Sequence, residues 1–191
     1  MIRPFFEEEE FSGITFTQDT LSKGEYDNCE FINCQLSNLN LSEFTFVDCL
    51  FKGCDLSTSQ LTKTAFSNVR FKDCKLVGMP FNECHEFMFS VQFENCLLNL
   101  SSFYKRKMKN TFFINCQLEE VDFTETDLSG SELPDCNLKN AIFERTNLEK
   151  ANLSSAYDFN IDPDINRIKK ARFSLRGLPG LLTQYDLKID I

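Results

Sequence analysis

The chain has 191 residues, a mass of 22.1 kDa and a formal net charge of −9 at pH 7. With 42% hydrophobic residues it is too apolar for a disordered acidic tail, and no apolar run approaches the ~20 residues of a membrane helix. We therefore expect one soluble, folded protein that does not bind nucleic acid directly, because phosphate contacts need an excess of Lys and Arg.

The N-terminal residues give no indication of export. Met1–Phe6 leads into Glu7–Glu10 without a long apolar segment or a small-residue cleavage site. The chain has nine cysteines, an odd number, which here favours reduced thiols in a cytosol over a disulfide framework. We expect a cytoplasmic protein.

A five-residue period dominates the chain from residue 11 to residue 153. Helices place apolar residues at i, i+3, i+4 and i+7 and strands alternate, so a strict step of five fits neither. Of the 28 positions in the two runs, 26 are Phe or Leu, so the pattern is not a product of composition. The runs, which differ in phase by two residues, are Phe11, Phe16, Leu21, Tyr26, Phe31, Leu36, Leu41, Phe46, Phe51, Leu56, Leu61, Phe66, Phe71, Leu76 and Phe81, then Phe93, Leu98, Phe103, Met108, Phe113, Leu118, Phe123, Leu128, Leu133, Leu138, Phe143, Leu148 and Leu153.

Small residues recur two positions before these centres, and we expect both to point inward. All nine cysteines lie in this column. Cys29/Cys34 and Cys49/Cys54 form two C-x4-C pairs, but a zinc site also needs sulfurs that converge on one point, and residues five apart lie on adjacent faces of a square coil. We therefore expect buried packing and no metal or cofactor. The cysteines are Cys29, Cys34, Cys49, Cys54, Cys74, Cys84, Cys96, Cys116 and Cys136.

A longer period of twenty is superimposed on the five. Phe103, Phe123 and Phe143 repeat at this interval, and so do several cysteines. Four five-residue faces would form one coil, and like side chains would stack in ladders between coils. About seven coils at ~4.8 Å give a rod roughly 35 Å long. The sequence therefore predicts an all-β fold, a parallel β-helix.

Three segments carry a resemblance to a known family: residues 31–36 (FINCQL), 126–130 (TDLSG) and 151–155 (ANLSS). They resemble the A(D/N)LXX unit of pentapeptide repeat proteins, over about residues 11 to 156. The resemblance implies a right-handed quadrilateral β-helix.

The repeat predicts two regions: a β-helix over residues 1–157, interrupted near 82–92, and a capping segment over 158–191. A further partial coil is expected after Asp162, because Ile168 and Phe173 return to the second phase. We predict a short helix starting near Pro179, and a final strand in which Leu187, Ile189 and Ile191 alternate with polar residues.

The C-terminal block, residues 168–189, is similar to the ending of a bacterial pentapeptide subfamily. That subfamily includes albicidin-resistance, microcin B17 immunity and plasmid quinolone-resistance (Qnr-like) proteins. The resemblance implies binding to DNA gyrase or topoisomerase IV, protection of that enzyme from a poison, and a homodimer formed through the C-terminal end. Unlike the quinolone-resistance members, this sequence shows no long projecting loop between coils. The residues expected at the dimer contact are Leu175, Leu178, Leu181, Leu182, Leu187 and Ile189.

No catalytic motif is evident. His85 is the only histidine, and no Ser, Cys or Asp set surrounds it in the sequence. A general base needs a positioned partner, so we expect a surface histidine and no enzyme activity.

Acidic residues are the more informative surface signal. The segment from residue 119 to residue 149 contains nine acids and only two cations, Lys139 and Arg145. They could be ordinary solvated positions, or an anionic rod face that mimics DNA and enters a basic groove. The second interpretation gives a DNA mimic that protects a topoisomerase; the alternative is a non-enzymatic scaffold or adaptor with another protein partner. The nine are Glu119, Glu120, Asp122, Glu125, Asp127, Glu132, Asp135, Glu144 and Glu149.

Overall fold

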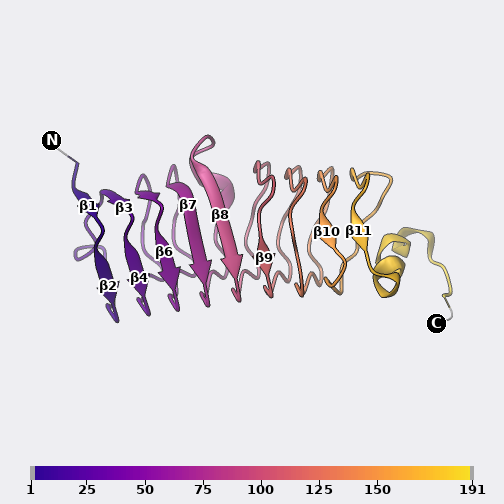
Figure 1. Cartoon of the computed structure of the whole chain (residues 1–191), viewed down its shortest axis with the longest axis horizontal. Coiled ribbons are helices and arrows are strands. Elements are labelled where there is room, and N and C mark those ends of the chain that lie inside the picture. The colour runs from indigo at the N-terminus through magenta and orange to yellow at the C-terminus, as the bar shows by residue number, and fades with distance from the viewer. Residues whose placement is uncertain (1–2, 190–191) are drawn as a thin grey trace.

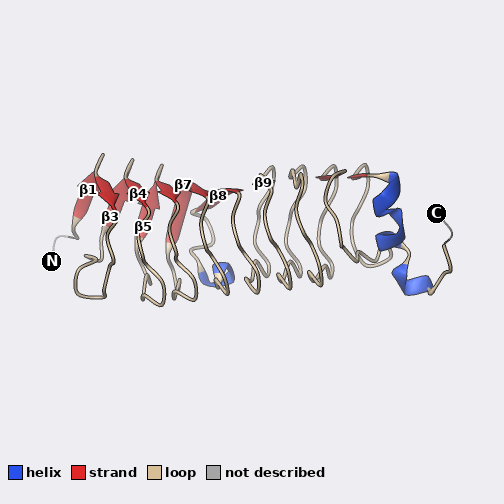
Figure 2. Ribbon diagram, turned by 90° about the horizontal axis from the view of Figure 1, so that it is seen from below, coloured by secondary structure: helices blue, strands red, loops and turns tan. Residues whose placement is uncertain are grey.

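The structure, a computed structural model, describes residues 3–189 and is a rod of stacked coils (Figure 1). About eight turns follow one another, and the two ends of the chain lie at opposite ends of the rod. A second view shows the strands gathered along one edge of the coils (Figure 2). The strands are β1 (Phe5–Glu7), β2 (Glu10–Ser12), β3 (Glu25–Asp27), β4 (Glu30–Ile32), β5 (Thr45–Val47), β6 (Leu50–Lys52), β7 (Ala65–Lys72), β8 (Phe89–Glu94), β9 (Phe113–Ile114), β10 (Asn152–Leu153) and β11 (Arg172–Phe173). The 3₁₀ helices are η1 (Phe81–Glu83), η2 (Leu175–Leu181) and η3 (Thr183–Tyr185).

Successive coils pair in parallel at intervals of twenty residues. Phe31, for example, aligns with Phe11 on one side and with Phe51 on the other. Strands β1, β3 and β5 form one row and β2, β4 and β6 form a second; both rows meet β7, which pairs with β8. The predicted all-β parallel β-helix with a twenty-residue coil is confirmed.

Each coil has four sides, named here by the residues that point inward. Side 1 is centred on Phe6, Tyr26, Phe46, Phe66, Phe89, Met108, Leu128, Leu148 and Ile168. Side 2 is centred on Phe11, Phe31, Phe51, Phe71, Phe93, Phe113, Leu133, Leu153 and Phe173. Side 3 is centred on Phe16, Leu36, Leu56, Leu76, Leu98, Leu118 and Leu138, and side 4 on Leu21, Leu41, Leu61, Phe81, Phe103, Phe123 and Phe143.

Aromatic columns run through the core. The ring centroids of Phe31 and Phe51 on side 2 lie 4.6 Å apart with the planes 7° apart. Rings of the opposite sides 2 and 4 meet edge to face across the core, as Phe103 and Phe113 do at 85°. Such pairs contribute about 0.5–1.5 kcal/mol each beyond the burial of their area. The many phenylalanines of the sequence therefore stack one coil on the next.

The corner after most centres needs a left-handed backbone. The residue two positions after the centre has a positive φ, +52° at Asn33 and +64° at Gly53 for example. Asn, Asp and Gly adopt this region at the lowest cost and fill many of these corners. Their side chains also connect coils, because the Asn115 amide donates to Asn95 at 2.9 Å.

The interruption of the repeat lies between Phe81 and Phe89. The spacing between aligned residues rises there from twenty to 22, since Phe71 aligns with Phe93. Although the sequence shows no long projecting loop, a short loop over residues 84–88, between η1 and β8, projects beyond the neighbouring turns (Figure 1). Two additional residues are thus accommodated in one turn while the coil continues with its register restored.

The cysteines are part of the core. All nine are buried and none forms a disulfide. Cysteines of neighbouring coils are in contact, since the backbone N–H of Cys34 donates to Sγ of Cys54 at 3.3 Å. Burial raises the pKa of the Cys49 thiol to about 12, so this group stays protonated at neutral pH. The expectation that the cysteines pack as small apolar residues is confirmed by their burial.

The C-terminal segment differs from the sequence-based prediction at two points. Helix η2 begins at Leu175 and not near Pro179, because Oγ of Ser174 accepts the Gly177 N–H at 3.1 Å and starts the turn earlier. Residues 187–189 form no strand: the predicted alternation of Leu187 and Ile189 has no neighbouring strand to pair with, and both side chains are exposed. Ile191 lies outside the described residues. Within residues 3–189 no helix is long and apolar enough to cross a membrane.

Candidate functional site

The nine acids singled out in the sequence lie on different sides of the rod. Residues twenty apart stack on one side, so acids spaced by five or seven residues are turned away from one another. The structure therefore brings together pairs and one trio, and not a single continuous face. Asp127 and Glu149 lie on side 1, Glu132 and Asp135 on side 2, Glu119 and Glu120 on side 3, and Asp122, Glu125 and Glu144 on side 4.

Three of these acids are paired with cations from neighbouring coils. Glu125 lies between Lys105 at 3.6 Å and Arg145 at 3.1 Å. Glu149 accepts from a guanidinium at 2.8 Å, and Asp127 has a lysine at 3.5 Å. Partial burial raises the pKa of Asp127, but hydrogen bonds from Ser129 and the nearby lysine outweigh it, so the pKa is lower than usual. These partly exposed pairs offset much of the negative charge at their positions.

The other six acids have no Lys or Arg within ion-pair distance among the described residues. Two of them are held by amides of the next coil: Glu119 accepts from Asn137 at 3.0 Å and Glu132 from Asn152 at 2.6 Å. All six lie on sides 2, 3 and 4 of the C-terminal half. The six are Glu119, Glu120, Asp122, Glu132, Asp135 and Glu144.

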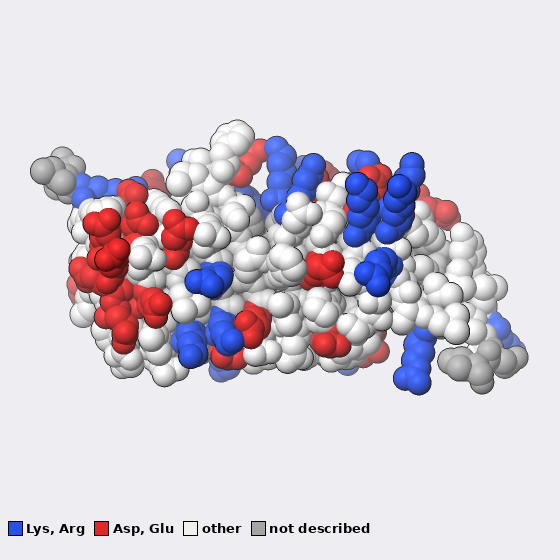
Figure 3. Space-filling view, in the orientation of Figure 1, with Lys and Arg blue, Asp and Glu red and all other residues white. Residues whose placement is uncertain are grey.

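A second acidic cluster, which sequence reasoning missed, covers the N-terminal end of the rod. Figure 3 shows carboxylates gathered over the N-terminal strands. The period of twenty could have revealed it: it places Glu7 beside Asp27 and Glu10 beside Glu30. The run Glu7–Glu10 alone gave no such signal, because its partners lie one coil further along the chain.

The projecting loop exposes an apolar tip. Phe87 is 82% exposed and Met88 is 39% exposed. Arg106 holds the base of the loop: it donates to the carbonyl oxygens of Asn82 and of His85, and its guanidinium carbon lies 5.3 Å from the centre of the Phe89 ring. Arg106 occupies the column otherwise filled mainly by small residues, which was the available sequence signal for this loop.

The C-terminal tail, residues 174–189, contains the residues predicted for dimerisation, and they fall into two groups by exposure. Leu181 packs against the core, and Leu182 is partly buried. Leu175 is 85% exposed, and three others are also exposed. Apolar side chains outside the core at one end of the rod are typical of a contact surface. The exposed members are Leu175, Leu178, Leu187 and Ile189.

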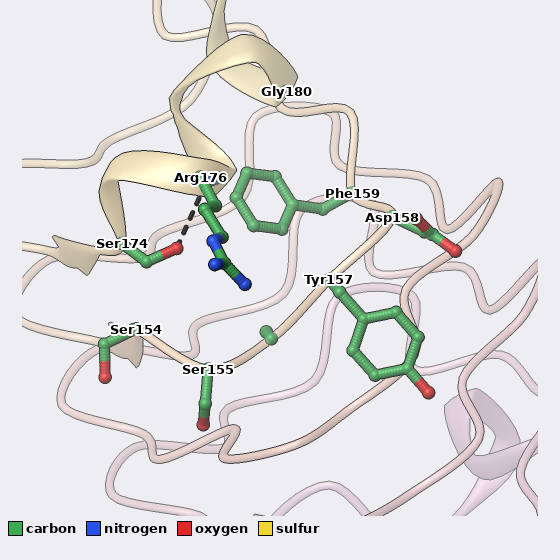
Figure 4. Close-up of a pocket in the computed structure, with 10 residues that line it drawn as sticks. Ser154, Ser155, Tyr157, Asp158, Phe159, Ser174, Arg176 and Gly180 are labelled. Carbon is green, nitrogen blue, oxygen red and sulfur yellow. Dashed lines mark hydrogen bonds between the residues drawn. The ribbon is translucent and has the colours of Figure 1, made fainter. Parts of the chain in front are cut away.

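A pocket of about 520 Å³ lies between the last full coil and η2 (Figure 4). Arg176 extends into it toward Ser154 and Ser155, beside the ring of Phe159. Asp158 points away from Arg176. The lining offers donors for a small polar group, and it places no carboxylate and no imidazole beside Arg176 for acid–base chemistry.

The family model described as "Pentapeptide repeat region" matches residues 24–86 and 86–156. No curated protein matches the chain significantly in sequence.

Among solved structures, a trypsin-treated form of QnrB1, a plasmid-mediated fluoroquinolone resistance protein, matches with a TM-score of 0.64 and 16% identity, covering 98% of this chain and 100% of that chain. A second trypsin-treated form also gives 0.64 and 16%, over 95% and 99%. HetL, a pentapeptide repeat protein involved in heterocyst differentiation regulation from the cyanobacterium Nostoc, gives 0.55 and 15%, over 89% and 85%. At these identities the likeness is one of fold.

Proposed function

Since this chain belongs to the pentapeptide repeat family, we propose that it is a non-enzymatic, DNA-mimicking protein of the cytoplasm that binds DNA gyrase or topoisomerase IV and protects it from a poison. The observation that carries the proposal is the set of six carboxylates without a cationic partner on sides 2, 3 and 4 of a long rod. The likeness to QnrB1 over the whole of both chains supports it.

The rod suits electrostatic recognition. Carboxylates fixed on rungs ~4.8 Å apart need little further ordering on binding, so a basic groove meets a preorganised anionic surface. B-DNA carries one charge per ~1.7 Å, so the protein presents a sparser charge array than the duplex. Such complementarity mainly accelerates encounter and sets orientation, and salt weakens it.

Two apolar features supplement these charges. The tip of the loop at Phe87 provides a large side chain of the kind that anchors interfaces. The exposed tail leucines form a homodimer contact in this proposal, which would place two acidic rods end to end. Neither feature requires a catalytic group, so the protein acts by binding.

Direct binding to purified gyrase and topoisomerase IV tests the proposal. We change the three most exposed acids of the set, Glu120→Lys, Asp135→Lys and Glu144→Lys, in one variant. Lysine already occupies left-handed corners at Lys63 and Lys150, so the changes at 120 and 135 suit the backbone. Affinity is expected to fall about tenfold or more at low salt.

The control reverses three acids of the other half: Glu10→Lys, Asp19→Lys and Glu30→Lys. It changes the net charge equally and is expected to retain more affinity. Equal loss in both variants would show that only net charge matters. No binding of the unaltered protein to either enzyme would refute the proposal.

A scaffold or adaptor role is the second candidate, because HetL, also a pentapeptide repeat protein, is involved in the regulation of heterocyst differentiation. Affinity capture distinguishes the two. A reproducible partner other than a topoisomerase subunit, lost on the triple charge reversal, would favour the adaptor.

A further inference from the structure

Side 1 of the rod carries opposite charges at its two ends. Over its first four rungs the outward positions hold five carboxylates and no Lys or Arg. Over its last four rungs they hold six Lys or Arg and two carboxylates. The acids are Glu7, Glu8, Glu25, Asp27 and Asp48, and the cations are Lys107, Lys109, Lys150, Arg167, Lys169 and Lys170. Figure 3 shows acids at the N-terminal end and cations along the edge of the C-terminal half.

Much of this charge is not neutralised within the chain. Lys107, Lys109 and Arg167 each have a carboxylate within 4 Å. Among the described residues no carboxylate lies within this distance of Lys150, Lys169 or Lys170. No Lys or Arg lies within it of four acids, Glu7, Glu8, Glu25 and Asp27. The remaining charges therefore lie at the two extremes of the strip.

The middle of the strip is apolar. Side 1 has nine rungs, from Phe6 to Ile168, and Phe89 occupies the fifth. The loop with the exposed Phe87 and Met88 enters this central rung. The order along the rod is thus acidic, apolar and basic, with about four rungs on each side of the centre.

We infer that side 1 binds side 1 of a second copy of this chain, antiparallel, about a two-fold axis near Phe89. A two-fold contact requires one patch to complement itself. Rotation about this axis places the rung of Glu7 and Glu8 opposite that of Lys169 and Lys170, twice. It also brings the two apolar loops together, the arrangement of an interface with an apolar centre and a charged rim.

The inference is independent of the proposed function and of the tail contact. In the antiparallel pair the two tails lie at opposite ends, and the six acids on sides 2, 3 and 4 stay outside the contact. The side 1 pairing is charge-dependent and should weaken at high salt, whereas an apolar tail contact should not.

Charge reversal at one end provides the test. An acidic variant carries Lys150→Glu, Lys169→Glu and Lys170→Glu; a basic variant carries Glu7→Lys, Glu8→Lys and Glu25→Lys. Left-handed corners hold both residue types elsewhere, at Glu43 and Lys63, so folding is expected to persist, and circular dichroism checks this.

In sedimentation at about 50 mM salt, each variant alone should lose the side 1 association by about tenfold or more, and an equimolar mixture of the two should associate. A chain with all six changes should recover self-association. The matched control, Lys52→Glu, Lys63→Glu and Lys139→Glu, alters the charge equally on the other three sides and should behave as the unaltered protein.

Zero-length carbodiimide crosslinking identifies the register. Glu8 and Lys170 of one chain lie eight rungs apart, ~38 Å at ~4.8 Å per rung, so a crosslink between residues 7–8 and 169–170 must join two copies. Such crosslinks, lost in either variant and regained in the mixture, are expected. A monomer at low salt, crosslinks confined to the tail, or no association in the mixture would overturn the inference.

Discussion

The ring of Phe93 stacks on the ring of Phe71 with centroids 5.5 Å apart and planes 12° apart, although 22 residues separate them, whereas aligned pairs away from the interruption are separated by twenty. The loop before β8 absorbs the two additional residues, and the aromatic column of side 2 passes through the interruption. The two halves of the repeat therefore share one core.

Removing a ring at this junction should destabilise the whole rod. Phe71→Ala leaves a cavity where the side chain is 1% exposed, so the free energy of unfolding should fall by about 3–5 kcal/mol. Phe112→Ala, at a position 45% exposed, should cost less than about 1 kcal/mol. Urea denaturation measures both. Similar losses for the two variants would contradict a continuous core.

Gly53 tests the corner geometry. A Cβ there would collide with Oδ1 of Asn33, whereas at Gly13, with nearly the same φ, nothing lies within 4 Å. Gly53→Ala should therefore cost about 1 kcal/mol more than Gly13→Ala, which carries only the backbone penalty. Adding Asn33→Ala to Gly53→Ala should remove the excess. A double variant as unstable as Gly53→Ala would exclude the contact as the cause.

Arg106 should control the projecting loop. Arg106→Ala removes the donors to the carbonyls of Asn82 and His85 and should increase amide hydrogen exchange at residues 85–88. Lys107→Ala, which removes only an exposed ion pair to Glu86, serves as the control and should have little effect. Equal exchange in the two variants would mean that Arg106 does not anchor the loop.

The buried thiols should be protected in the folded protein. Iodoacetamide should modify the nine cysteines only after denaturation, because all are buried.

The Cys49 thiol of the unfolded chain ionises near pH 9, whereas the folded pKa is about 12. Burial of the protonated Cys49 thiol therefore stabilises the fold fully below about pH 9, and this stabilisation is lost as the pH rises to about 12. In the Cys49→Ala variant the free energy of unfolding should therefore fall less between pH 9 and pH 12 than in the unaltered protein. The same pH dependence in both proteins would contradict this role of the Cys49 thiol.

The tail contact should be apolar. Leu175→Ser, Leu178→Ser and Leu187→Ser remove exposed leucines and should convert a dimer to a monomer in light scattering at about 0.5 M salt, where charge-dependent pairing is screened. Ile165→Ser, also exposed but before the tail, is the control. A monomer before any change would rule out this dimer.

The fold followed from the sequence because the five-residue step is set by one physical requirement, an inward side chain on each side of a square coil. Placing Phe31 beside Phe51 required only the period of twenty. The start of η2 at Leu175 was not predicted, because the Ser174 cap is a local hydrogen bond that competes with the usual role of Pro179 at a helix start.

The surface was less predictable. The acids between 119 and 149 are dense in the sequence, yet a step of five turns each one to another side, and cations from other coils pair with Glu125, Asp127 and Glu149. Charge on a solenoid depends on residues twenty apart, and a window along the chain does not report it.

The most direct measurement is gyrase supercoiling in a titration of this protein, with and without a fluoroquinolone or an albicidin-type poison, with a parallel DNA-relaxation assay for topoisomerase IV. We expect supercoiling to recover in the presence of the poison, and the triple reversal at Glu120, Asp135 and Glu144 to weaken that recovery. Inhibition without recovery would leave DNA mimicry and contradict protection. No effect with either enzyme would contradict the central claim.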